Sequence, residues 1–179
     1  MLAALFWSGN FIIGKFAYLF EVPPLTLNFL RWASVWFILL PFTYKNIYNN
    51  LSNIKKNWLV ISFMGVITIS TFNSVVYFAL NYTQVINAVL VLAAIPAVTI
   101  FFSFLLKVEK TNIFQLTGLF LSIIGIGAII SNADIQKITS LNFNKGDLWM
   151  LVCVFSWAIY STLLKKNKFE FSQFSLIQL

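Results

Sequence analysis

The sequence predicts an all-α membrane protein, a polytopic bundle of transmembrane helices. Of its 179 residues, 60% are hydrophobic and only 9% are charged, which is too apolar for an ordinary water-soluble domain. The apolar residues form runs of roughly 20, the length that a helix needs to cross the hydrocarbon core. These runs are continuous and do not alternate with period two, which excludes a transmembrane β-barrel.

Six apolar runs are long enough to be transmembrane helices. They cover approximately residues 1–18, 25–44, 58–80, 85–106, 114–130 and 148–164. The third and fourth runs are separated only by residues 81–84, which predicts a tight hairpin. Because no basic leader precedes the first apolar run, we expect no cleavable signal peptide, and we expect the first span to have lost its start.

The positions of the basic residues predict the orientation. The connections after the second, fourth and sixth runs contain Lys45, Lys55, Lys56, Lys107, Lys110, Lys165, Lys166 and Lys168. On the other side, three lysines are diluted by three acids, namely Lys15, Lys137 and Lys145 by Glu21, Asp134 and Asp147. The positive-inside rule places the lysine-rich connections in the cytoplasm. We therefore expect a multi-pass protein of the cytoplasmic (inner) membrane with its N-terminus inside.

The first and sixth apolar runs resemble each other. Trp7 and Lys15 recur as Trp157 and Lys165 with the same separation. Because five spans per unit is an odd number, the second unit starts from the opposite side of the membrane, which makes an inverted repeat of the kind found in secondary transporters. We predict a first five-helix repeat in residues 1–131, an extracytoplasmic linker in 132–147 and the start of a second repeat in 148–179. The chain then contains six of ten expected spans.

Short motifs along nearly the whole chain carry a family resemblance. They are residues 5–11 (LFWSGNF), 23–31 (PPLTLNFLR), 79–83 (ALNYT), Pro96, 105–109 (LLKVE), Gly118 and 125–127 (GIG). In this order and spacing they make the chain resemble the EamA-type proteins of the drug/metabolite transporter superfamily. The resemblance implies a ten-helix carrier with a central cavity, which exports, or less often imports, metabolites such as amino acids.

We therefore expect a secondary transporter that works by alternating access. Its expected partners are the lipid bilayer and a small-molecule substrate, with a homodimer as a candidate assembly. The chain has no His, one Cys and no clustered acids, so an enzyme, a metal site, a cofactor or a nucleic-acid partner is not expected. No Asp or Glu lies inside the six runs, so this chain is not expected to couple transport to protons through an intramembrane carboxylate. A non-transporting assembly or receptor subunit remains an alternative, because polar stripes on helices serve packing equally well.

Arg31 is the one charged residue well inside a predicted span, roughly 10 Å below the surface at about 1.5 Å per residue. It either meets an anionic substrate or serves as a structural tether that reaches the surface or a neighbouring helix. Either Asn28, three residues earlier on the same face, or Glu21, one loop away, is its expected hydrogen-bond partner.

Polar and aromatic residues in the other spans complete the candidate substrate site. Ser70, Asn73 and Tyr77 form a polar stripe on the third span. The predicted substrate-binding set is Trp7, Asn10, Arg31, Asn73, Tyr77, Asn87, Trp157 and Tyr160, with Ser161 as a further candidate for the cavity wall. Interhelical hydrogen bonding is the alternative role for the polar members.

Two further features concern helix shape and packing. Pro96 lies in the middle of the fourth span and should kink it. Gly118, Ser122 and Gly125 form a small-residue stripe on the fifth span, which predicts close contact with another helix.

Overall fold

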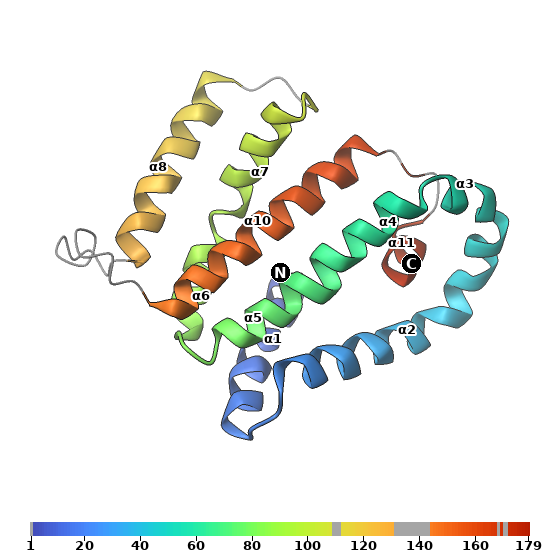
Figure 1. Cartoon of the computed structure of the whole chain (residues 1–179), viewed down its shortest axis with the longest axis horizontal. Coiled ribbons are helices and arrows are strands. Elements are labelled where there is room, and N and C mark those ends of the chain that lie inside the picture. The colour runs from blue at the N-terminus through green and yellow to red at the C-terminus, as the bar shows by residue number, and fades with distance from the viewer. Residues whose placement is uncertain (1, 109–111, 131–143, 168, 170–171) are drawn as a thin grey trace.

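The computed structural model describes residues 2–108, 112–130, 144–167, 169 and 172–179. Most of these residues are helical, and the long helices lie beside one another in an open array (Figure 1). The elements are α1 (Leu2–Leu19), α2 (Pro24–Asn49), α3 (Leu51–Lys56), α4 (Trp58–Gly65), the π-helix η1 (Val66–Phe72), α5 (Asn73–Ala79), α6 (Val85–Leu92), α7 (Ile95–Leu105), α8 (Ile113–Ile130), α10 (Lys145–Lys166) and α11 (Gln173–Gln178).

The helices follow the apolar runs of the sequence closely. Four continuous segments are long and apolar enough to cross a membrane: Pro24–Asn49, Trp58–Ala79, Val85–Leu105 and Lys145–Lys166. A fifth apolar segment, Ile113–Gly125 in α8, is shorter among the described residues. These segments confirm the predicted all-α polytopic membrane protein. The total of six spans and the inverted repeat stay predictions.

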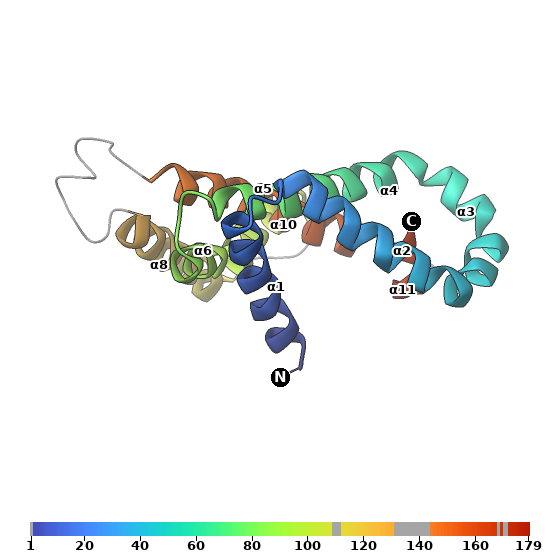
Figure 2. The same ribbon diagram turned by 90° about the horizontal axis from the view of Figure 1, so that it is seen from below.

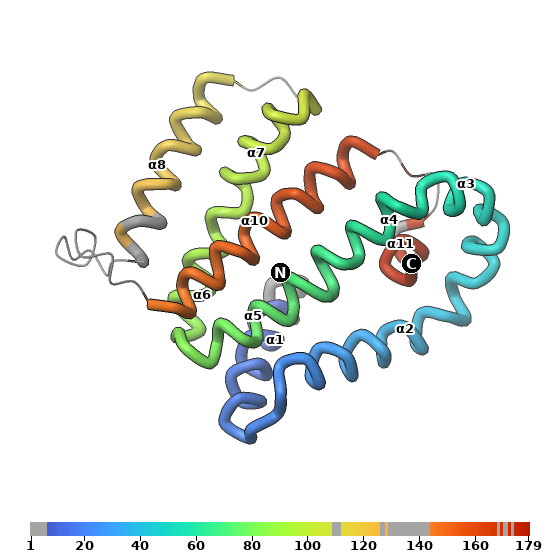
Figure 3. Tube along the Cα trace, viewed as in Figure 1, coloured from blue at the N-terminus to red at the C-terminus, as the bar shows by residue number. Residues whose placement is uncertain are grey.

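Two of the predicted spans are irregular inside. The third consists of α4, η1 and α5 in direct succession, so a seven-residue π-helix lies in its middle. The fourth is broken after Leu92 and restarts at Ile95, with Pro96 in the first turn of α7 (Figure 3). Proline is tolerated there because a first-turn N–H has no partner within the helix. The kink predicted at Pro96 is therefore a break between two helices.

Helix α10 lies at the centre of the packing and contacts α5, η1, α6 and α7. The buried core on both sides of it includes Val76, Leu80, Ala88 and Met150, all with at most 2% of their surface exposed. Helix α8 packs on α6 and α7, and α11 packs on α2. Helix α1 projects away from the plane of the other helices (Figure 2).

The small-residue stripe of α8 does not make the predicted helix contact. A Cβ atom built on Gly118 or Gly125 would meet no atom within 4 Å. Helix α8 lies at the edge of the array, so within the described residues this stripe faces open space (Figure 1). Among the described residues, the expected close packing is therefore not made at these two positions.

The lysine-rich ends of the helices lie at one end of the array. Helix α3, the end of α7 and the end of α10 lie together there, whereas the α5–α6 turn and the start of α10 lie at the other end (Figure 1). We call these the lysine-rich end and the opposite end. The same grouping was predicted from the positions of the lysines alone.

Candidate functional site

A cavity of about 1260 Å³ lies between α1, α2, α4, η1, α10 and α11. Its wall is mostly apolar, as expected of a bundle with this composition. Six members of the predicted set line it: Trp7, Asn10, Arg31, Asn73, Trp157 and Tyr160. Ser161 and Thr68 contribute further hydroxyl groups to the wall.

Arg31 is the centre of a polar network at one wall of this cavity. Its Nη1 donates to Asn10 Oδ1 and to Tyr77 Oη, and its Nη2 donates to Asn73 Oδ1. The Tyr77 hydroxyl in turn donates to Asn10 Oδ1 over 2.6 Å. The side chains of four residues predicted separately from the sequence, on three predicted spans, are therefore in one hydrogen-bonded network.

The partners predicted for Arg31 were wrong. Asn28 directs its amide nitrogen to Ile69 O at 2.8 Å and to Ser74 Oγ at 2.9 Å. Glu21 is exposed in the turn after α1, where its φ of 57° places it in the left-handed region. Spacing along α2 suggested Asn28, but the contacts of Arg31 depend on how α1 and α5 pack against α2, which a local pattern does not contain.

These contacts bear on the two interpretations of Arg31. An arginine at the centre of a transmembrane helix costs about 2.5–3.5 kcal/mol on insertion scales, and one at partial depth, such as Arg31, costs less. Here three neutral oxygens on α1 and α5 accept hydrogen bonds from Arg31. Arg31 therefore links three helices, and its guanidinium group does not extend to the membrane surface. The described contacts use three of the five N–H donors of a guanidinium group, so two remain for a ligand or for water. A tether and a ligand contact are thus compatible in one residue.

The π-helix positions Asn73. The Asn73 backbone N–H bonds to Thr68 O, five residues earlier, and its side-chain Nδ2 also donates to Thr68 O at 2.8 Å. With the amide nitrogen held in this way, the amide oxygen is free to accept from Arg31. π-helical segments occur frequently at functional sites. Sequence analysis did not predict this one.

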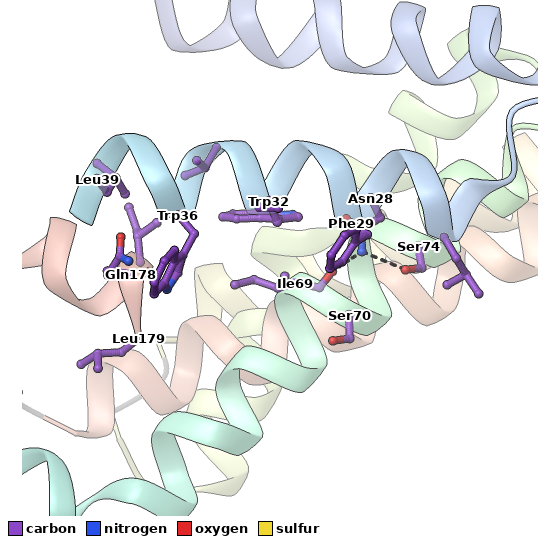
Figure 4. A pocket seen from close by; sticks show the side chains of 14 residues that line it. Asn28, Phe29, Trp32, Trp36, Leu39, Ile69, Ser70, Ser74, Gln178 and Leu179 are labelled. Atoms are coloured by element: carbon purple, nitrogen blue, oxygen red, sulfur yellow. Dashed lines mark hydrogen bonds between the residues drawn. The ribbon is translucent and has the colours of Figure 1, made fainter. Parts of the chain in front are cut away.

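The predicted polar stripe of the third span does not face one direction. Asn73 and Tyr77 turn toward Arg31, whereas Ser70 lines an adjoining cavity of about 540 Å³ between α2 and the third span (Figure 4). The two cavities share several lining residues, Trp32 and Ile69 among them. Ser70 lies inside η1, where the helical period is longer than that assumed for an α-helix. The second cavity has no charged residue in its lining.

An aromatic wall adjoins the network. The ring of Trp157 lies 5.9 Å from that of Trp7, 4.7 Å from that of Phe72 and 5.6 Å from that of Tyr160, measured between centroids. Trp7 and Trp157 are the residues that match in the predicted repeat, and they meet face to edge. Trp32, which sequence analysis missed, also lines the cavity, and its ring lies 5.3 Å from the Arg31 guanidinium carbon.

Two members of the predicted set differ from the others. Tyr77 is only 2% exposed and does not itself line the cavity. Its hydroxyl accepts a hydrogen bond from Arg31, which does line it. Asn87 lies on α6, partly exposed, and does not belong to the cavity lining. The structure therefore brings seven of the eight residues together and leaves Asn87 apart.

Comparison with known proteins identifies the family of the chain. Residues 1–131 match the EamA-like transporter family. The chain belongs to this family. The family resemblance drawn from the short motifs is thereby confirmed.

Three similar proteins are named as uncharacterized transporters. YyaM of Bacillus subtilis (strain 168) is 29% identical over 131 residues, which are 73% of this chain and 42% of that protein. A protein of Archaeoglobus fulgidus is 29% identical over 176 residues, 98% of this chain and 59% of that protein. One of Clostridium kluyveri is 25% identical over 170 residues, 93% of this chain and 55% of that protein. This EamA-type chain thus spans about half the length of these relatives. No solved structure gives a significant match.

Proposed function

We propose that this chain is part of a secondary transporter that moves small metabolites, amino acids or related compounds, out of the cell across the cytoplasmic membrane. Its membership of a transporter family supports transport, and its apolar helices support an integral multi-pass protein. Within this proposal, the lysine-rich end faces the cytoplasm and the N-terminus lies inside. The two halves of the full transporter alternate between access from either side.

The observation that carries the proposal is a large cavity with a charged polar network in one wall. An apolar wall with a few converging polar groups is typical of small-molecule sites. The partners of Arg31 are neutral oxygens, so the network carries a positive charge that suits a carboxylate. The rings of Trp7, Trp157 and Tyr160 offer apolar surface for the rest of such a compound.

Substrate flux through the full-length protein in proteoliposomes tests this proposal. The first measurement loads vesicles with a panel of labelled amino acids and follows their saturable exchange. The second repeats this measurement with Asn73→Leu and Tyr77→Leu combined. The combined variant removes two of the three acceptors of Arg31, and with them the hydroxyl that donates to Asn10. We expect transport to fall at least tenfold, with a change in which amino acids compete.

Ser70→Leu is the matched control, since Ser70 lies on the same span but does not line the cavity that contains Arg31. It should leave transport within about twofold of the unmodified protein. Unchanged transport and selectivity in the combined variant would show that the substrate binds elsewhere. Absence of saturable flux in the folded, unmodified protein would instead favour a non-transporting membrane subunit.

A further inference from the structure

The cavity and the closed part of the bundle lie toward different ends. On α10 the cavity is lined from Trp157 to Leu164, the half that leads to the lysine-rich end. On the third span it is lined from Ile61 to Asn73, again toward that end. Beyond these residues the helices are tightly packed, and Leu80 and Met150 are fully buried. The cavity is therefore closed at the opposite end.

A polar cluster holds this closed end together. The Thr83 hydroxyl donates to Asp147 Oδ1 over 2.5 Å, and Asp147 is only 1% exposed. The Lys15 ammonium donates to Leu80 O at 2.6 Å and to Thr83 O at 3.2 Å. We call Lys15, Thr83 and Asp147 the Thr83 cluster. It joins α1, the α5–α6 turn and the first turn of α10.

The buried Asp147 was not expected from the sequence. Span six was predicted from residue 148, with Asp147 in a connecting segment, but α10 begins at Lys145 and includes it. The first turn of this helix also packs closely, because a Cβ on Gly146 would lie 2.8 Å from Ala79 O and from Thr83 N. A carboxylate that is nearly inaccessible and bonded across helices fixes their relative position more firmly than apolar contact, which has no direction.

The Thr83 cluster also crosses the boundary that the predicted repeats define. Lys15 and Thr83 belong to the first repeat, and α10 opens the second. If the repeats rock against each other during transport, a contact between them at one end has to break when that end opens.

We propose that the Thr83 cluster is the gate that closes the cavity at the opposite end, and that the transport cycle breaks the Thr83–Asp147 hydrogen bond. This inference rests on the proposed transport function. Lys15 is a positioning residue in this scheme: its two bonds to carbonyl oxygens hold the α5–α6 turn, and thereby Thr83, against Asp147.

Cysteine accessibility in the full-length protein tests the gate. The reporter is Ser161→Cys in the cavity wall. The protein without this substitution serves as the blank for labelling of the native cysteines, of which Cys153 is fully buried. A membrane-impermeant maleimide is applied to membrane vesicles of either orientation. In the otherwise unmodified protein we expect fast labelling from the lysine-rich side and slow labelling from the opposite side.

Thr83→Val removes the hydroxyl while keeping the shape of the side chain. We expect it to raise labelling from the opposite side about tenfold, which corresponds to about 1.4 kcal/mol in the closing equilibrium. Thr83→Ser keeps the hydroxyl and should label like the unmodified protein. Lys15→Met should act in the same direction as Thr83→Val, and it decides the question if the valine variant does not fold.

Two outcomes would overturn the gate. One is equal labelling from the opposite side in folded Thr83→Val, Thr83→Ser and unmodified protein; the other is slower labelling in Thr83→Val. Amino acid flux through the unmodified protein is measured in parallel. Normal flux with unchanged accessibility refutes the gate alone, whereas absence of flux in the unmodified protein refutes the proposed function.

Discussion

Replacing Gly146 with Ala should destabilise the junction between α10 and the α5–α6 turn. A Cβ at this position would lie 2.8 Å from Ala79 O, Thr83 N and Thr83 Cβ, whereas ordinary contact begins at 3.4 Å. Two of the three atoms are backbone, so no side-chain rotation relieves the clash. The start of α10 has to move by the difference, about 0.6 Å. That movement stretches the Thr83–Asp147 hydrogen bond.

The size of the effect follows from these contacts. Overpacking a close-packed site by one methyl group typically costs about 1–3 kcal/mol. For a full-length protein about twice as long as this chain, soluble-protein scaling converts each kcal/mol to roughly 1–2 °C in the unfolding midpoint. We therefore expect Gly146→Ala to lower the midpoint of the detergent-solubilised full-length protein by several degrees.

Thermal unfolding followed by tryptophan fluorescence measures this shift. Gly118→Ala is the control, because a Cβ there would meet nothing within 4 Å. Alanine also favours a helix over glycine by roughly 0.5–1 kcal/mol, so the control should keep or raise the midpoint. A Gly146→Ala protein as stable as the Gly118→Ala protein would refute the close approach of α10 to the turn.

Three further substitutions test the local structure by thermal unfolding. Tyr77→Phe removes a hydroxyl that bonds to Arg31 and Asn10, and should cost about 1–3 kcal/mol because these groups lose a buried partner; an unchanged midpoint would contradict the network. Glu21→Gly should raise the free energy of unfolding by about 1 kcal/mol, because position 21 has a φ of 57°, in the left-handed region where a Cβ is unfavourable. A lower midpoint would contradict this turn geometry. Asn144→Ala should cost about 1 kcal/mol, because the Asn144 side chain caps α10 by accepting from Gly146 N; Asn144→Asp, which keeps the acceptor, should not.

The extent of the helices was predictable because it depends on local properties. Runs of about 20 apolar residues cannot leave backbone polar groups unpaired in lipid, and a helix pairs them within one segment. The predicted boundaries of the second and third spans consequently agree with Pro24–Asn49 and Trp58–Ala79 to within a few residues, apart from the longer end of α2. The lysines likewise marked which helix ends lie together (Figure 1).

The candidate site was predictable only as a set of residue types. A polar or charged side chain inside an apolar run needs a partner, which is why Arg31, Asn10 and Asn73 stood out. Their mutual contacts were not predictable from periodicity, since η1 shifts the phase of the third span and turns Ser70 away from Asn73. Asn87 was predicted on the same grounds, as a polar residue inside an apolar run, but it lies outside the cavity.

The sequence alone determined that these residues form membrane-embedded helices and which family they belong to, because hydrophobicity and short motifs are properties of contiguous residues. Tertiary structure alone decided which oxygens receive the Arg31 donors and that Asp147 is buried against Thr83. Those pairings join residues that are 21 to 64 positions apart. They depend on how packed helices are rotated and spaced relative to one another, and the sequence of a single helix does not define either quantity.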